Sequence, residues 1–196
     1  MPAFERGFKT WAERISLSFR NDLRLTETAP LSPDTLANYL DVRLWAPGDV
    51  KGLSQGQLDQ LVNKDKSGWS AVTIRLGDSH VVISNPTHSP GRRSSDIMHE
   101  IGHIIAGHEP SKMVLSPDGQ LAMRTFDQKQ EDEADWLRGC LLLPRPALLQ
   151  IRKARLSESQ ACTAYGVTSE LLNYRLNVTG VNFQLQRLAR RYRVAR

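Results

Sequence analysis

The segment Asp96–His108, with the sequence DIMHEIGHIIAGH, constrains the fold more strongly than any other part of the chain. At about 100° per residue, His99 and His103 lie one turn apart on one side of a helix, with Glu100 at its edge. The opposite side is a continuous apolar arc, formed by Ile97, Met98, Ile101, Ile104 and Ile105. Gly107 is expected to end the helix. The helix is therefore predicted to bury its arc while two imidazoles and a carboxylate face a common cavity.

The HExxH spacing of His99, Glu100 and His103 is typical of zinc metallopeptidases. In such sites two neutral imidazoles bind the metal, and the glutamate lies near the reacting water. A catalytic zinc usually takes three protein ligands and leaves its fourth position to water or substrate. The sequence must therefore supply a third ligand from outside this motif.

His108 does not fit as the third ligand of a metzincin site. Ala106 stands where that motif needs glycine, and His108 comes one residue early. On a continuing helix, His108 would point about 140° away from His103. A deformylase-like site needs a cysteine ligand before the helix, whereas Cys140 and Cys162 both follow it. Neither type of site is therefore expected.

A second predicted helix, at residues 130–144, offers a better third ligand. Glu131 and Asp135 are four residues apart, so they share a face of this helix. A glutamate ligand with an aspartate one turn later is the gluzincin arrangement, in which the aspartate accepts the free N–H of a metal-bound histidine. Glu133 lies about 200° away from Glu131 and shares its face with Leu137, which suits the core. Glu131 is therefore the expected ligand, and removal of Glu133 is expected to leave zinc affinity nearly unchanged.

Taken together, three short motifs resemble those of the ImmA/IrrE metallopeptidases. They are HEIGH at 99–103, EDEAD at 131–135 and LLLP at 141–144. The resemblance extends over residues 32–180 and implies a cytoplasmic zinc endopeptidase with His99, His103 and Glu131 as metal ligands. It also implies that one cut inactivates a helix-turn-helix transcriptional repressor, in the control of mobile elements or in a stress response.

The chemistry of such an enzyme assigns a role to Glu100. This carboxylate takes a proton from the attacking water and returns it to the leaving amine. A side-chain donor would help the metal to stabilise the oxyanion. The sequence leaves that donor open among His80, His88, His108, Tyr165 and Tyr174.

Composition favours a globular cytoplasmic protein. Of the 196 residues, 40% are hydrophobic, which is enough for a core. No run of about 18 apolar residues exists, and the apolar residues near the N-terminus are spaced, so neither a membrane span nor a signal peptide is expected. The spacing of these residues is helical and favours packing in a core: Phe4, Phe8, Trp11, Ile15 and Phe19. The two distant cysteines indicate reduced thiols and a cytoplasmic location.

The order of the predicted elements indicates an α+β, zincin-like fold. Short helices are expected at 33–39 and 54–63, and strands at 42–45, 69–76 and 80–84. They predict a small antiparallel sheet packed on the HExxH helix and on the second ligand-bearing helix, with an edge strand available to an extended substrate. Three parts are expected: an N-terminal helix and linker at 1–31, a zincin-like metallopeptidase domain at 32–150, and a C-terminal helical part with a basic arm at 151–196.

The C-terminal part resembles a helix-turn-helix, with its turn at Gly166. In a DNA reader, exposed positions of the second helix, including Asn173 and Tyr174, would contact the nucleic acid. Arg190 and Arg191 belong to a basic arm whose last ten residues hold five arginines and largely supply the net charge of +5. These four residues are candidate contacts to DNA or to a partner protein. Packing or substrate docking is the favoured role of the helix pair, and DNA binding is not favoured.

Three functions remain open from the sequence. The first is a site-specific zinc endopeptidase. The second is a DNA-binding regulator whose metal site is structural or vestigial, and the third is a module that holds a partner without cutting it. Bound zinc with an open water position favours the first function. DNA affinity that survives zinc removal favours the second, and partner binding without new chain termini favours the third.

Overall fold

The computed structural model of this chain describes residues 4–108, 113–115, 122–124 and 127–194, and it describes side chains for residues 4–108 and 127–187. The helices are α1 (Phe8–Asp22), α2 (Pro33–Tyr39), α3 (Gln55–Asp59), α4 (Pro90–Ala106), α5 (Gln128–Leu142), α6 (Arg145–Lys153), α7 (Glu158–Tyr165), α8 (Ser169–Val178) and α9 (Val181–Val194). Two short turns of other helix types are η1 (Pro47–Asp49) and η2 (Gln60–Lys64). The strands are β1 (Val42–Trp45), β2 (Ala71–Leu76), β3 (Ser79–Ser84), β4 (Met113–Leu115) and β5 (Ala122–Arg124). These elements confirm the predicted α+β class.

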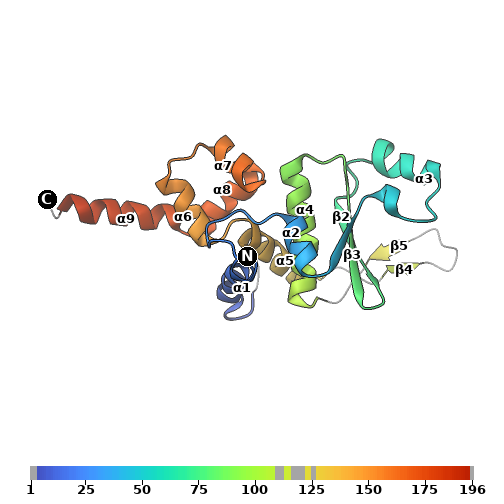
Figure 1. Cartoon of the computed structure of the whole chain (residues 1–196), viewed down its shortest axis with the longest axis horizontal. Helices are drawn as coiled ribbons and strands as arrows, with labels where there is room; N and C mark the ends of the chain where they lie inside the picture. The colour runs from blue at the N-terminus through green and yellow to red at the C-terminus, as the bar shows by residue number, and fades with distance from the viewer. Residues whose placement is uncertain (1–3, 109–112, 116–121, 125–126, 195–196) are drawn as a thin grey trace.

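Helix α4 lies at the centre of the molecule, with the main sheet on one side and helices α1, α5, α6, α7 and α8 on the other (Figure 1). Strands β2 and β3 pack on one side of α4, and α5 packs along its other side. Helix α1 in turn packs on α5. Helices α6, α7 and α8 gather at the far end, and α9 projects away from them (Figure 1). The two helices that carry the predicted metal ligands are therefore direct neighbours in the interior.

The main sheet has three strands in the order β1-β3-β2. Strands β2 and β3 form the predicted antiparallel hairpin, in which Ala71 lies opposite Ser84. Strand β1 instead runs parallel to β3, with Val42 opposite His80, so the expectation of a wholly antiparallel sheet is wrong for this pair. Two parallel neighbouring strands need a crossover connection. Here the segment with η1, α3 and η2 leads the chain from β1 to β2 at the opposite edge of the sheet, and the hairpin then returns it as β3 between them.

The N-terminal helix α1 supplies part of the core, as its apolar spacing predicts. Phe19 is buried, and Phe8, Trp11 and Ile15 pack against the buried cluster. Within the described ranges of the chain, no helix is both long and apolar enough to cross a membrane. Both cysteines are free thiols, and burial raises the pKa of Cys140 to about 12.

Two buried arginines hold the C-terminal end of α5. Arg20 of α1 donates to the carbonyl oxygen of Leu141 at 2.8 Å and to that of Ala29 at 3.0 Å. Arg175 of α8 donates to the carbonyl oxygen of Leu143 at 3.2 Å. The last carbonyls of a helix have no partner within it, so these cations satisfy groups that would otherwise be buried without one. Burial lowers the pKa of Arg20 to about 10, which leaves the guanidinium charged at neutral pH.

We expect Arg20→Met to lower the free energy of unfolding by about 3 kcal/mol, because it leaves several buried carbonyl oxygens without a donor. The measurement is urea unfolding followed by circular dichroism. Arg14, which is exposed on the same helix, provides the matched control. Arg14→Met should change the free energy by less than about 0.5 kcal/mol. Equal effects of the two substitutions would contradict the capping role of Arg20.

Helix α7 begins and ends, and helix α8 begins, at the capping residues that the sequence predicts. Ser157 begins α7 with a capping box in which its side chain and that of Gln160 exchange bonds with the backbone. Gly166 ends α7 in the left-handed conformation, with φ of 61°, and the Thr168 side chain caps the start of α8. The turn between the two helices therefore lies where it was predicted.

Candidate metal centre

Three side chains from α4 and α5 converge at the centre of the fold. His99 and His103 come from α4 and Glu131 from α5, and one ligand atom of each lies within 4.8 Å of the others. The two histidine Nε2 atoms are 3.0 Å apart. Glu131 places Oε2 3.2 Å from Nε2 of His99 and Oε1 3.7 Å from Nε2 of His103. Two imidazole nitrogens and a carboxylate around one point match the donor set of catalytic zinc sites, so these residues fit such a metal.

A close approach of the two helices brings these three side chains together. Gly102 lies between the two histidines and is buried against α5. A Cβ atom at this position would lie 3.1 Å from the carbonyl oxygen of Ala134. Any side chain at position 102 would therefore require the backbone of α5 to shift by a few tenths of an ångström, in the segment that carries Glu131.

The ring of His99 is held by an aspartate on the side opposite to the cluster. Its Nδ1 lies 2.9 Å from Oδ1 of Asp135, which also pairs with Arg138 at 3.2 Å. Burial lowers the pKa of His99, but the hydrogen bonds with Asp135 and Glu131 outweigh it and raise the pKa to about 9. Burial alone would raise the pKa of Asp135, yet the His99 bond and the Arg138 charge leave it below its usual value. Because Nδ1 is bonded to Asp135, Nε2 is the nitrogen that faces the cluster.

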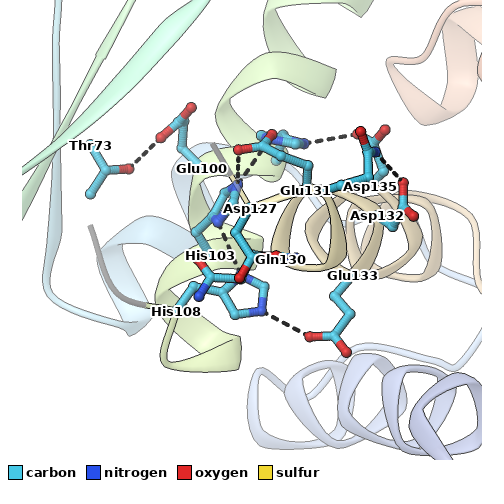
Figure 2. A network of polar contacts seen from close by, with 12 residues as sticks. Thr73, Glu100, His103, His108, Asp127, Gln130, Glu131, Asp132, Glu133 and Asp135 are labelled. Carbon is cyan, nitrogen blue, oxygen red and sulfur yellow. Dashed lines mark hydrogen bonds and ion pairs between the residues drawn. The ribbon is translucent and has the colours of Figure 1, made fainter. Parts of the chain in front are cut away.

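Glu100 is buried at the border of the cluster, on the side of the sheet (Figure 2). Its Oε2 accepts a 2.6 Å hydrogen bond from the hydroxyl of Thr73 on β2. Thr73 was not predicted from the sequence. Strand alternation separates the two faces of β2, but it does not say which face packs on α4. The contact fixes the orientation of the one carboxylate in the HExxH motif.

His108 returns to the site after α4 ends. Helix α4 stops at Ala106, and Gly107 takes the left-handed conformation with φ of 67°. Nδ1 of His108 then lies 3.0 Å from Nδ1 of His103, and its Nε2 lies 3.1 Å from Oε2 of Glu133. The expected direction away from His103 assumed a continuing helix, and Gly107 was the signal against it. Glu133 is buried, and it is connected to His103 through His108.

Comparison with known proteins identifies the family. The family model described as the IrrE N-terminal-like domain, of the M78 peptidases, matches residues 56–177. This match includes α4 and α5, and with them every residue of the cluster. The chain belongs to the M78 peptidase family. No curated protein matches it significantly.

The M78 chain is also similar to a solved structure, described as a Mycobacterium tuberculosis transcriptional regulator. The two share 14% sequence identity with a TM-score of 0.48. The similarity covers 88% of this chain and 47% of that chain, so the M78 chain spans about half the length of the regulator.

Three of the candidate oxyanion donors, His88, Tyr165 and Tyr174, form contacts with other residues in the structure. Nδ1 of His88 lies 2.6 Å from Oδ2 of Asp96. The hydroxyl of Tyr165 donates to a backbone carbonyl in the loop after α1, at 2.9 Å. The ring of Tyr174 packs edge-on against Trp136. None of these three contacts involves His99, His103 or Glu131.

The candidate DNA or partner contacts of the M78 chain lie on α8 and α9. Asn173 donates to Glu158 of α7 at 3.0 Å, and Tyr174 is 43% exposed. The side chains of Arg190 and Arg191 lie outside the described part of the chain. Their contacts, and those of Asn173 and Tyr174 with another molecule, stay predictions.

Proposed function

We propose that this chain is a zinc-dependent, site-specific endopeptidase of the cytoplasm, which cleaves a helix-turn-helix transcriptional repressor in mobile-element or stress regulation. One observation carries the proposal: ligand atoms of His99, His103 and Glu131 lie within 4.8 Å of one another, in a domain of a peptidase family. The buried carboxylate of Glu100 lies beside them. A ligand set and a proton acceptor at one point are the parts that hydrolysis needs.

His99, His103 and Glu131 would hold the zinc. When bound there, zinc would lower the pKa of the attacking water and polarise the scissile carbonyl. Asp135 keeps the His99 proton on Nδ1, so that Nε2 presents its lone pair to the cluster. These residues thus bind the metal and hold the ligand geometry.

Glu100 performs the proton transfers. Its carboxylate accepts the proton of the attacking water and delivers it to the nitrogen of the leaving amine. Thr73 supports this role because its hydroxyl holds one carboxylate oxygen in place. A carboxylate with a fixed orientation needs less rearrangement before each transfer.

Strand β2 is the expected guide for the substrate chain. It lies at the edge of the sheet and carries Thr73, which contacts Glu100. An extended segment that pairs with this edge would pass directly beside Glu100. A folded domain does not offer several extended residues, so the cut is expected in a linker or exposed segment of the repressor.

A cavity of about 630 Å³, which is linked to the site through Arg138, would receive substrate side chains. It lies between the first turns of α4 and helix α8, and its lining includes Arg92, Arg138 and Glu170. Arg138 is the ion-pair partner of Asp135, which connects the cavity wall to the ring of His99. Side chains of both charge signs line the cavity. This arrangement favours binding of particular substrate sequences over binding of any extended chain.

The test is digestion of purified substrates by the zinc-loaded protein, followed by intact-mass spectrometry. We expect one cut in a repressor with a helix-turn-helix domain, and resistance of casein and of several folded proteins. This substrate specificity is expected because the site needs an extended segment whose side chains match the cavity. Rapid digestion of casein at many bonds, with no preference for any repressor, would contradict the proposed specificity.

A further inference from the structure

A chain of three polar groups runs from His103 away from the ligand cluster (Figure 2). Nδ1 of His103 lies 3.0 Å from Nδ1 of His108, and Nε2 of His108 lies 3.1 Å from Oε2 of Glu133. The side chains of His108 and Glu133 are only 7% and 12% exposed. Buried polar groups at these distances are hydrogen-bonded, so each shared proton needs one donor and one acceptor.

Only one arrangement of protons leaves His103 ready to bind a metal through its Nε2. A neutral imidazole carries a single N–H, so a lone pair on Nε2 places the proton of His103 on Nδ1. This N–H donates to Nδ1 of His108, which must then be an acceptor. His108 consequently carries its own proton on Nε2 and donates it to the carboxylate of Glu133. Every donor in the chain then has an acceptor.

We propose that His108 and Glu133 are positioning residues, which fix the tautomer and the ring orientation of His103 for metal binding. The inference rests on the proposed zinc site and adds two residues that hold it. Asp135 contacts Nδ1 of His99 directly, and Glu133 acts on Nδ1 of His103 through an intervening imidazole. Each of the two histidine ligands is thus linked to its own carboxylate on α5.

The backbone after α4 makes the second link possible. Gly107 has φ of 67°, which an L side chain rarely adopts, and it turns His108 back beneath His103. Glu133 lies two residues from Glu131 on α5, on the face that the metal ligands do not use. Its carboxylate therefore contacts His108, and His108 bridges it to His103.

The test is the zinc dissociation constant of the purified chain, measured by competition with a chelator. His108→Leu removes the acceptor of His103, and we expect it to weaken zinc binding about tenfold to a hundredfold. Glu133→Leu removes the end of the chain and should weaken binding about tenfold. This expectation replaces the nearly unchanged affinity predicted from helix spacing alone, because the structure connects Glu133 to His103 through His108. Asp132→Leu is the matched control, because Asp132 lies on the same helix and is bonded to Gln128. It should change the constant by less than about twofold.

A conservative variant separates positioning from packing. The amide oxygen of His108→Asn can take the place of Nδ1 and accept the His103 proton, so zinc affinity should stay within about threefold of wild type. Addition of Glu133→Leu to His108→Asn should then have no further effect, because the link to Glu133 is already broken. Nitrogen NMR of the zinc-loaded wild type should show protons on Nδ1 of His103 and on Nε2 of His108.

Each result of the zinc-affinity and NMR measurements either supports or overturns the positioning role of His108 and Glu133. Wild-type zinc binding together with unchanged affinity in His108→Leu and Glu133→Leu would overturn the positioning role and leave the proposed function standing. A His103 proton on Nε2 in the zinc-loaded protein would also overturn it. Equal losses in His108→Asn and His108→Leu would indicate packing alone and overturn it. Failure of the wild type to bind zinc would overturn the proposed function itself, and this inference with it. If His108→Leu does not fold, His108→Asn and Glu133→Leu still decide the matter.

Discussion

Glu100→Gln is expected to abolish nearly all cleavage while the fold and zinc affinity stay as in the wild type. Glutamine keeps the shape of the side chain and can still accept the Thr73 hydroxyl through its amide oxygen. It cannot accept a proton from water, and general acid–base catalysis contributes about 10² to 10⁴ in rate. The measurement is kcat/KM on a fixed peptide from the repressor, together with the zinc content of each protein.

Asp132→Asn serves as the control for this first prediction. It makes the same chemical change on α5, at a residue bonded to Gln128. Its kcat/KM should match that of the wild type within about twofold. If Glu100→Gln keeps near wild-type activity, Glu100 is not the proton acceptor, even though its carboxylate is buried beside the cluster.

Glu131→Ala is expected to cause the largest loss of zinc affinity of any single change on α5. It removes the carboxylate that lies 3.2 Å from His99 and leaves two imidazoles, which do not complete a catalytic zinc site. Asp135→Ala removes only the support of His99 and should weaken binding about tenfold to a hundredfold. Chelator competition measures both constants. Wild-type affinity in Glu131→Ala would show that the third ligand lies elsewhere.

The face of α4 that carries the site could be predicted because it depends on local geometry alone. A period of 3.6 residues places His99 and His103 together and their apolar neighbours opposite. The same geometry aligns Glu131 with Asp135 on α5. Caps are local as well, which is why the starts of α7 at Ser157 and of α8 at Thr168 could be foreseen.

The features that sequence reasoning missed depend on contacts between distant segments. Thr73 and Glu100 are 27 residues apart, and only the packing of β2 on α4 joins them. His108 was misplaced because a single left-handed residue, Gly107, reverses the direction of the chain. Arg20 would be expected on the surface, yet it is buried because the end of α5 needs donors.

The parallel pairing of β1 with β3 shows a related limit. Strand positions follow from local alternation, but the direction of pairing depends on where the connecting segment carries the chain. The elements between β1 and β2 take the chain across the sheet, and no local pattern in the sequence states this.

The most direct test compares newly formed protein N-termini in cells that express the wild type or Glu100→Gln. The account predicts a small set of termini that appears only with the wild type and lies within a repressor that carries a helix-turn-helix domain. Identical termini in the two cultures, together with a stable complex between the chain and an uncut partner, would contradict it and point to a module that binds without cutting.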